Sequence, residues 1–420
     1  SYYMLWNFHH IILDGWCTPI IIGELIKTYQ KLENGDKIHI SSRPYKDYIN
    51  WLSKRDNEES IDFWKNHLQN AKKTLLTFSY GASQENEHKE LHDILPKTLS
   101  QKLMRAAKNY KITLSDICQF AWGYLLRRYT NQNDILFGIT VSGRSIELPQ
   151  IEDMLGLFIN TLPQRLRIND DELIRDVLQK IHCQVVGMNK FSYIPLSKIQ
   201  SLMEERDGEN LFNTLFIFEG TKIHRDVSKD SGINIKGVAT DEKIEYPLTL
   251  LIHSHNDEIK TIFLYKNKFF RKEHIIQLRK HYINILEKIV EETTRVVGDL
   301  DIFDDKEKCS ILNKWRGRDF PLSEKDHILP TFKRHVKENP ALIAVSDKNQ
   351  FFTYKKLDET SNKVSLFLQK IGVDKSTPVV LMYERSCEYV AGLLGIWKTN
   401  SVYVPIDPKM PLPRVERIIK

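Results

Sequence analysis

Residues 9–16 read His-His-Ile-Ile-Leu-Asp-Gly-Trp, and this stretch decides how the rest of the chain is interpreted. The largely apolar residues 2–8 ahead of it predict a buried strand. The residues from Thr18 to Leu32 behind it carry apolar side chains at helical spacing. The stretch is therefore expected at a strand-to-helix turn, where side chains project into a cleft and where histidine could move protons near neutral pH.

The two adjacent histidines cannot point the same way from an extended backbone, so one is expected to face a core and the other a channel. Asp14 precedes Gly15, and it either shapes the turn or pairs with a distant cation. Taken alone, the pattern fits a structural histidine pair as well as a proton-transfer site. A metal site is disfavoured, because no second His/Cys cluster with ligand spacing lies nearby.

Six segments downstream of the histidine pair carry further motifs, and their order along the chain matters. They are Tyr45–Trp51, Asp62–Leu68, Asp134–Arg144, Gly156–Arg165, Tyr193–Leu196 and Leu211–Glu219. Together with His9-His10-x-x-x-Asp14-Gly15, they resemble the condensation domains of nonribosomal peptide synthetases, in the chloramphenicol-acetyltransferase-like superfamily. The ordered run makes a chance match untenable.

The last quarter of the chain resembles a different domain. Phe352–Leu357 is similar to the first core motif of adenylation domains, and Tyr403–Pro408, with Pro411, Pro413 and Arg414 behind it, is similar to their second. Condensation followed by adenylation is the module order of a peptide synthetase. One departure concerns loop geometry: Lys398–Val402 stands where the family usually has Lys-Ala-Gly and another small residue.

The resemblance implies an α/β fold made of α+β two-layer lobes. We expect the end of a condensation N-terminal lobe at residues 1–75, a complete C-terminal lobe at 76–299, a linker at 300–326 and the truncated start of an adenylate-forming (ANL-type) α/β domain at 327–420. Residues 79–90 predict a loop. The patterns predict helices at 97–110, 113–130, 273–291 and 357–371, and strands at 135–141, 157–167, 214–218, 248–253, 259–265 and 379–383.

Composition fits a globular multidomain enzyme. A length of 420 residues suggests two to three domains, and 41% hydrophobic with 28% charged residues is ordinary for such chains. No apolar run is long enough for a membrane span. The net charge of +6 is interspersed, and the one short basic-aromatic stretch, Lys266–Lys272, is better explained as a solvated strand end than as a nucleic-acid site. Five scattered cysteines favour reduced thiols and a cytoplasmic location.

The resemblance also assigns roles at the motif. His10, the second histidine, is the predicted catalytic residue, either as general base on an acceptor amine or by orienting that amine. His9 is predicted to be structural. Asp14 is predicted to be structural too, with Arg144 as the partner of its carboxylate.

Two further residues complete the predicted site. Gly15 is expected to permit close backbone approach, and its amide could contact an oxyanion. Asn160 is predicted to be a structural strand-end residue rather than a channel-lining group. Trp16 and Trp51 are predicted to be packing residues. No metal or cofactor is expected to bind this chain directly.

The implied reaction is peptide-bond formation between two thioesters held on phosphopantetheine arms. The expected partners are carrier-protein domains upstream and downstream and the remainder of the adenylation domain, which alone would need ATP and Mg²⁺. We expect the chain to be a piece of a larger synthetase and to be inactive by itself. Cys17, where serine is commoner, favours a D-configured donor.

Two alternatives remain at this point. An epimerisation domain shares the double histidine but would show Val-Ser-Trp-Arg after Asp-Gly, which is absent here. A non-catalytic recruitment domain usually loses the histidine motif, which is intact here. Heterocyclisation domains replace these histidines with aspartates and are excluded more firmly.

Overall fold

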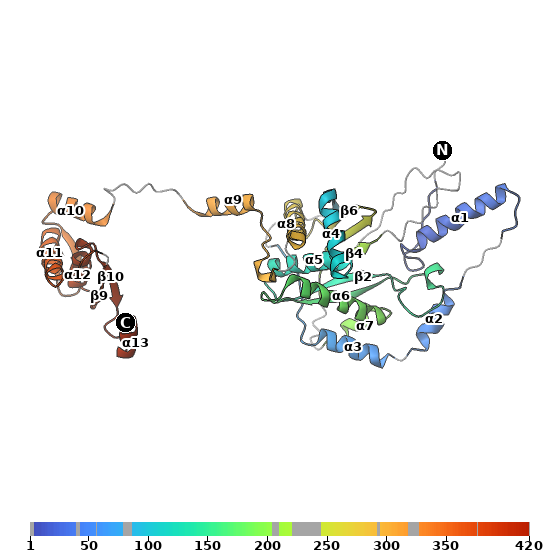
Figure 1. Cartoon of the computed structure of the whole chain (residues 1–420), viewed down its shortest axis with the longest axis horizontal. Helices are drawn as coiled ribbons and strands as arrows, with labels where there is room; N and C mark the ends of the chain where they lie inside the picture. The colour runs from blue at the N-terminus through green and yellow to red at the C-terminus, as the bar shows by residue number, and fades with distance from the viewer. Residues whose placement is uncertain are drawn as a thin grey trace. The chain divides into compact units, whose positions relative to one another are not determined.

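The computed structural model describes residues 4–38, 43–55, 57–78, 86–203, 210–220, 245–291, 295–317, 327–375 and 377–419. Over these residues the chain forms two units, Ser1–Ser310 and Ile311–Lys420 (Figure 1). The described part of the first unit is built on a six-stranded sheet in the order β1-β6-β5-β4-β2-β3. Its strands are His88–Ile94 (β1), Asp134–Val141 (β2), Asn160–Arg167 (β3), Thr214–Glu219 (β4), Leu248–His255 (β5) and Glu258–Lys266 (β6).

The sheet is mixed. β4 runs parallel to both β2 and β5, whereas β3, β6 and β1 join it in antiparallel register. The parallel pairs β2–β4 and β4–β5 lie in the middle, which agrees with the burial that parallel strands need. Their apolar side chains form the main core of the unit.

A layer of helices covers this sheet. It consists of α4 (Lys97–Tyr110), α5 (Leu114–Thr130), α6 (Ile174–Lys190) and α8 (Lys272–Glu291). α5 lies at its centre, touching the other three helices as well as β2 and β4, and every residue from Asp116 to Arg127 is buried. Thr113 and Asp116 form the capping box at its start, so the helix start expected from the sequence is confirmed.

Most predicted elements are confirmed within a few residues, but two expectations at the N-terminal side are wrong. Residues 4–8 form no strand, and Leu5 is 96% exposed, because no described strand lies beside them to pair with; residues 2 and 3 lie outside the described residues. The loop expected at 79–90 is wrong at its end, where β1 begins at His88; residues 79–85 lie outside the described residues.

β1 was missed because it is an exposed edge strand. Its sequence, His-Lys-Glu-Leu-His-Asp-Ile, is mostly polar, and most of its side chains are exposed. Edge strands commonly carry charges that discourage pairing with other molecules. A search for apolar alternation therefore does not find it.

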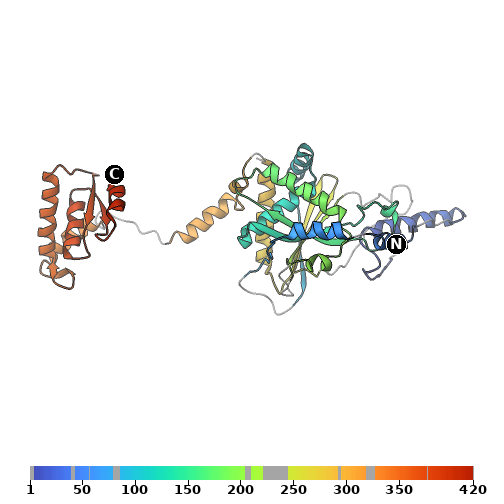
Figure 2. The same cartoon turned by 90° about the horizontal axis from the view of Figure 1, so that it is seen from below.

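Ahead of the sheet the chain forms α1 (Cys17–Glu33), α2 (Lys46–Ser53) and α3 (Glu58–Leu68). Figure 2 shows the first unit from below. Arg165 of β3 ties α3 to the sheet of this unit. Its guanidinium donates to the Asp134 carboxylate at 2.8 and 2.6 Å and to the backbone carbonyls of His67 and Gln69 at 2.8 and 2.9 Å. A buried arginine with these partners holds the C-terminal end of α3 in place.

The start of the predicted linker is helical and bound to the first unit. The first turn of α9 (Asp305–Trp315) contacts α8 through Lys280, whose ammonium lies 2.9 Å from Asp304, just ahead of α9, and 3.1 Å from Glu307. The His281 imidazole bridges Glu307 at 3.1 Å and the Tyr129 hydroxyl at 2.8 Å. We call Lys280, His281, Asp304 and Glu307 the junction cluster. Residues 318–326 of the linker lie outside the described residues.

The second unit contains a hairpin, a parallel strand pair and helices. Its elements are α10 (Ile328–Glu338), β7 (Ile343–Ser346), β8 (Phe351–Thr353), α11 (Tyr354–Lys370), β9 (Pro378–Met382), α12 (Cys387–Lys398), β10 (Val402–Ile406) and α13 (Leu412–Ile419). The helix predicted at 357–371 and the strand predicted at 379–383 are thereby confirmed. β9 and β10 pair in parallel.

The unusual loop between α12 and β10 keeps a glycine-like conformation. Asn400 has φ +58°, the left-handed region that asparagine tolerates better than most residues. The Lys398 ammonium, at the end of α12, contacts Asp358 and Ser361 of α11, both at 2.7 Å. The Ser401 hydroxyl donates to the Asp374 carbonyl at 2.8 Å. The departure from Lys-Ala-Gly therefore does not open the loop.

Candidate functional site

The two histidines of the motif differ in their surroundings. Both side chains are exposed at a turn that precedes α1, so the expectation that one of them faces a core is not met among the described residues. His9 accepts a hydrogen bond at Nδ1 from the backbone N–H of Ile11, at 3.1 Å, so its ring is tied to its own turn. His10 makes no hydrogen bond with any residue that the structure describes. The second histidine is thus the one that has both ring nitrogens available to another molecule, whereas the first has its Nδ1 engaged.

Asp14 anchors the other end of the turn. Its side chain is only 2% exposed, and its carboxylate faces the Arg144 guanidinium at 3.3 Å. The second carboxylate oxygen accepts from the backbone N–H groups of Phe158 and Ile159, at 3.0 and 3.3 Å. The contact with Arg144 that the sequence suggested is present, and the two amides add charge-assisted hydrogen bonds to it.

Arg144 is held from several directions at once. It donates to the carbonyls of Ile151 and Met154 at 2.6 and 2.8 Å, and its guanidinium lies 4.1 Å from the centre of the Phe158 ring. Gly143 before it has φ +66°, and a Cβ there would lie 1.8 Å from the Phe158 carbonyl oxygen. Only glycine fits that position, which explains the Gly-Arg pair at the end of β2.

Cys17, the first residue of α1, is the third member of this network, after Asp14 and Arg144. Its fully buried thiol lies 3.2 Å from both an Asp14 carboxylate oxygen and the Gly156 carbonyl. It also accepts from the Gly156 N–H at 3.3 Å and from Arg144 at 3.5 Å. Burial raises the pKa of the Cys17 thiol, which keeps it protonated and neutral. We call Asp14, Cys17 and Arg144 the motif cluster.

The sequence did not single out Cys17 as part of the site. The available signal was its position three residues after Asp14, which places the two side chains on one side of the first helical turn. Asp14 accepts the Cys17 backbone N–H at 3.0 Å, so this turn forms as expected.

An aromatic cluster supports the same segment. The Tyr45 hydroxyl donates to the Leu157 carbonyl at 2.6 Å, and its ring meets Phe158 edge-on at 5.1 Å. Gly156 packs so closely that a Cβ would lie 2.1 Å from the Tyr45 ring. Burial raises the pKa of Tyr48, beside them, to about 12. The segments Tyr45–Trp51 and Gly156–Arg165 therefore pack against each other in the fold.

Both tryptophans near the motif make packing contacts. Trp16 donates its indole N–H to the Glu152 carbonyl at 3.0 Å. Trp51 meets the Tyr193 ring edge-on at 5.4 Å, and the Arg55 guanidinium lies 4.3 Å from its ring centre. These contacts agree with the packing role predicted for them.

Gly15 makes no close contact with the described residues on the side where a Cβ would lie. No described atom lies within 4 Å of the position that a Cβ would take, and its φ is not in the left-handed region. Neither packing nor backbone conformation of the described residues requires glycine there. Asn160, at the start of β3, donates to the carbonyls of Ser192 and Ile194 at 2.8 and 2.7 Å and thereby ties the strand to the loop after α6.

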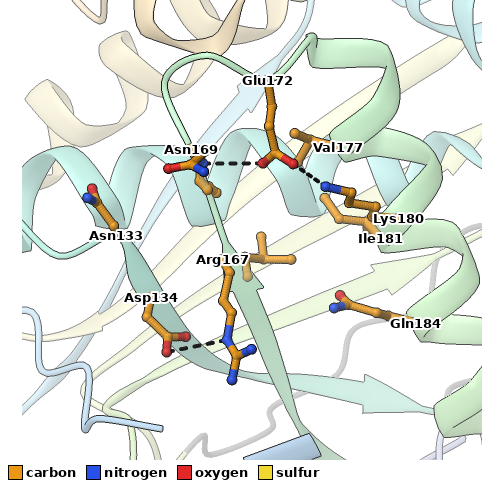
Figure 3. A pocket seen from close by; sticks show the side chains of 11 residues that line it. Asn133, Asp134, Arg167, Asn169, Glu172, Val177, Lys180, Ile181 and Gln184 are labelled. Atoms are coloured by element: carbon orange, nitrogen blue, oxygen red, sulfur yellow. Dashed lines mark hydrogen bonds and ion pairs between the residues drawn. The ribbon is translucent and has the colours of Figure 1, made fainter. Parts of the chain in front are cut away.

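A pocket of about 490 Å³ lies elsewhere, between the ends of β2 and β3 and α6 (Figure 3). Its lining residues include none of the predicted site residues. Its charged groups are paired with one another: Arg167 with Asp134, and Lys180 with Glu172. We therefore assign the site to the motif turn and not to this pocket.

The described residues offer neither a metal site nor a membrane-spanning helix. They contain no group of three or more His, Cys, Asp or Glu side chains placed to hold a metal ion. None of the described helices is long and apolar enough to cross a membrane. All five cysteines are free thiols.

A mixed sheet under a helical layer, with a histidine turn anchored by a buried carboxylate, defines a condensation-type α/β lobe. Residues 1–312 match the family model of the condensation domain, and residues 332–420 match that of AMP-binding enzymes. The chain belongs to the condensation-domain family of nonribosomal peptide synthetases, and it continues into the start of an adenylation domain.

The curated relatives belong to peptide synthetases. The chain is 33% identical to one of the linear gramicidin synthase proteins of Brevibacillus parabrevis over 99% of its own length, and 31% identical to bacitracin synthase 1 of Bacillus licheniformis over all of it. It spans 8% of the length of each of these proteins.

A solved structure shares the fold. The holo form of AB3403, a four-domain nonribosomal peptide synthetase, matches 97% of this chain and 32% of its own with a TM-score of 0.60 at 21% identity. The expected condensation fold, followed by the beginning of an adenylate-forming domain, is confirmed.

Proposed function

We propose that the first unit forms a peptide bond between two carrier-bound substrates and that His10 is its catalytic residue. The amine of an acceptor aminoacyl thioester attacks the carbonyl carbon of a donor thioester. A C–N bond forms, the C–S bond breaks, the amine loses a proton and the phosphopantetheine thiol of the donor is released. The donor chain thereby moves to the acceptor.

The observation that carries this proposal is the contrast between a fixed turn and a free ring. Asp14 is buried and bound to Arg144 and two backbone amides, whereas the His10 side chain four residues earlier is exposed and unpartnered among the described residues. A general base must lie within reach of the proton that it removes, and a rigid support keeps it in that position. Such an arrangement suits a group that acts on an incoming amine.

His10 can contribute in two ways. As a general base it would supply about 10²–10⁴-fold, which suffices because a thioester is already activated. As a hydrogen-bond acceptor it would orient the amine, and the tethering of both substrates would supply the larger share. The Gly15 amide would be a hydrogen-bond donor to the oxyanion that forms on the thioester carbonyl.

The partners follow from this chemistry. Both substrates would arrive on phosphopantetheine arms of carrier-protein domains, and the second unit would be completed by the remainder of an adenylation domain that uses ATP and Mg²⁺. His9 would serve as a structural residue, since its Nδ1 is already engaged by the turn. Asn160 and Arg144 would hold the neighbouring segments.

The test is peptide formation by the complete synthetase module containing this chain, with both carrier domains loaded. His10→Ala is expected to lower the rate constant of peptide formation by about 10²-fold or more, without a change in melting temperature, because the side chain is exposed and unpartnered among the described residues. His9→Ala serves as the matched control on the adjacent exposed residue.

Unchanged peptide formation by His10→Ala would refute the catalytic role. A wild-type module that bound a partner protein but formed no peptide would favour the recruitment alternative. The pH profile separates the two roles of His10. A general base gives a rate that falls as the histidine becomes protonated and a profile that the variant loses, whereas an orienting group lowers the rate evenly across pH.

A further inference from the structure

Cys17 attaches the motif turn to Gly156, a residue that the Asp14 carboxylate does not contact. Asp14 binds the backbone amides of Phe158 and Ile159, at 3.0 and 3.3 Å. The Cys17 sulfur binds the N–H and faces the carbonyl of Gly156, at 3.3 and 3.2 Å. The turn is therefore attached at two separate places on one segment, which fixes its orientation as well as its position.

The thiol also completes the hydrogen bonding inside the cluster. It lies 3.2 Å from an Asp14 carboxylate oxygen and accepts from Arg144 at 3.5 Å. A thiol has a single proton, so at any moment it donates either to Asp14 or to the Gly156 carbonyl. With the side chain fully buried, water cannot replace these contacts if they are removed.

We propose that Cys17 is a positioning residue for the condensation reaction, acting through the turn that carries His10. The inference rests on the proposed function. Cys17 does not touch substrate; it fixes the angle at which the histidine turn leaves the segment 156–159. A misplacement of about 1 Å can lower a rate about 10²-fold, so loss of one of two attachment points is expected to lower it about tenfold.

The experiment is a single-turnover assay of the complete module with both carrier domains loaded, comparing Cys17→Ala, Cys17→Val and Cys17→Ser. The two apolar variants bracket the size of the thiol and remove its hydrogen bonds. They are expected to lower the rate constant about tenfold while the amplitude of product stays at the wild-type value. Serine restores a donor and an acceptor, so Cys17→Ser is expected to recover most of the lost rate.

Cys118→Ala is the matched control, because Cys118 is also a fully buried thiol but belongs to the core around α5. It is expected to leave the rate constant unchanged. If the Cys17 variants lose amplitude and keep the rate constant, the residue only supports folding and the proposal is overturned. The same conclusion follows if Cys17→Ser is as slow as Cys17→Ala.

The outcomes also separate this inference from the proposed function. A wild-type module that forms no peptide overturns the proposed function, and the inference with it. A wild-type module that forms peptide, together with Cys17→Ala at the wild-type rate constant, overturns the inference alone.

Discussion

The Asp14–Arg144 pair of the motif cluster and the Lys280–Asp304 pair of the junction cluster both join opposite charges, yet the two pairs differ in burial. At the motif, the Asp14 and Arg144 side chains are each 2% exposed. At the junction between α8 and α9, the Lys280 and Asp304 side chains are 42% and 39% exposed. The first pair is shielded from water, whereas the second remains largely hydrated.

This difference determines what each cluster can do. A buried ion pair is expensive to form and still more damaging to break, so it holds a turn in one geometry. An exposed pair contributes little and is screened by salt, so it suits a contact that can loosen. The motif cluster thus supports a reaction site, and the junction cluster supports the attachment of a linker helix.

The largest expected effect on stability comes from breaking the buried pair. Asp14→Ala leaves Arg144 without its counter-charge and removes the acceptor for two backbone amides. We expect the free energy of unfolding to fall by about 3–5 kcal/mol, with activity lost through misfolding. Chemical denaturation of the chain, followed by circular dichroism, measures the change.

Asp14→Asn is the control for this variant. It keeps the shape and an acceptor for the amides of Phe158 and Ile159 but removes the charge, so it separates hydrogen bonding from ion pairing. An Asp14→Ala protein that is soluble and melts normally but forms no peptide in the complete module would contradict the structural role. Asp14 would then act on the reaction itself.

Much of the fold was predictable because its core elements carry strong local patterns. α5 has a capping box at Thr113 and a long buried run, and β4 and β5 are short apolar strands in the middle of the sheet. The edge strand β1 has neither signal, since its side chains face solvent. The strand expected at residues 2–8 failed for the opposite reason: its apolar side chains are present, but no described strand pairs with residues 4–8.

The ion pair of the site was predictable from the sequence. A buried carboxylate at the motif turn needs a cation, and Arg144 was the predicted partner that the structure places there. Cys17 could not be found by that reasoning, because a thiol carries no charge and its partners at Gly156 are backbone groups far away in sequence. The absence of close neighbours around Gly15 could not be predicted either, because it depends on which of the described atoms the fold brings near this residue.

A half-buried histidine without an ion-pair partner among the described residues extends the comparison between the two clusters. Burial lowers the pKa of His67, at the end of α3, from 6.5 to about 4. Between these values the unfolded chain binds a proton that the folded chain does not, so stability falls as pH decreases from 6.5 to 4. The total loss is expected to be about 3 kcal/mol, measured by denaturant unfolding of the chain across this pH range.

His67→Asn is the matched variant, because its side-chain amide can take the place of the ring N–H that faces the Pro163 carbonyl. It does not titrate, so its stability is expected to be flatter between pH 6.5 and 4. A variant whose stability follows the same slope as the wild type would show that another group causes the acid sensitivity.

The smallest expected effect belongs to the exposed side of the junction cluster. Lys280→Ala removes the ammonium that contacts Asp304 and Glu307, and we expect it to lower the free energy of unfolding by less than about 1 kcal/mol. About 1 M salt should abolish most of that difference, while it leaves the effect of Asp14→Ala nearly intact.

Acid should loosen the same contact. The Glu307 amide and then the Lys280 ammonium lower the pKa of Asp304 from 3.8, so its contribution is present above that value and is lost as pH falls below it. Lys280→Gln controls for the lost hydrocarbon chain, because it keeps most of the side chain and a donor. A Lys280→Ala loss that matched that of Asp14→Ala and resisted salt would mean that exposure does not distinguish the two clusters, and that α9 is held as firmly as the turn that carries His10.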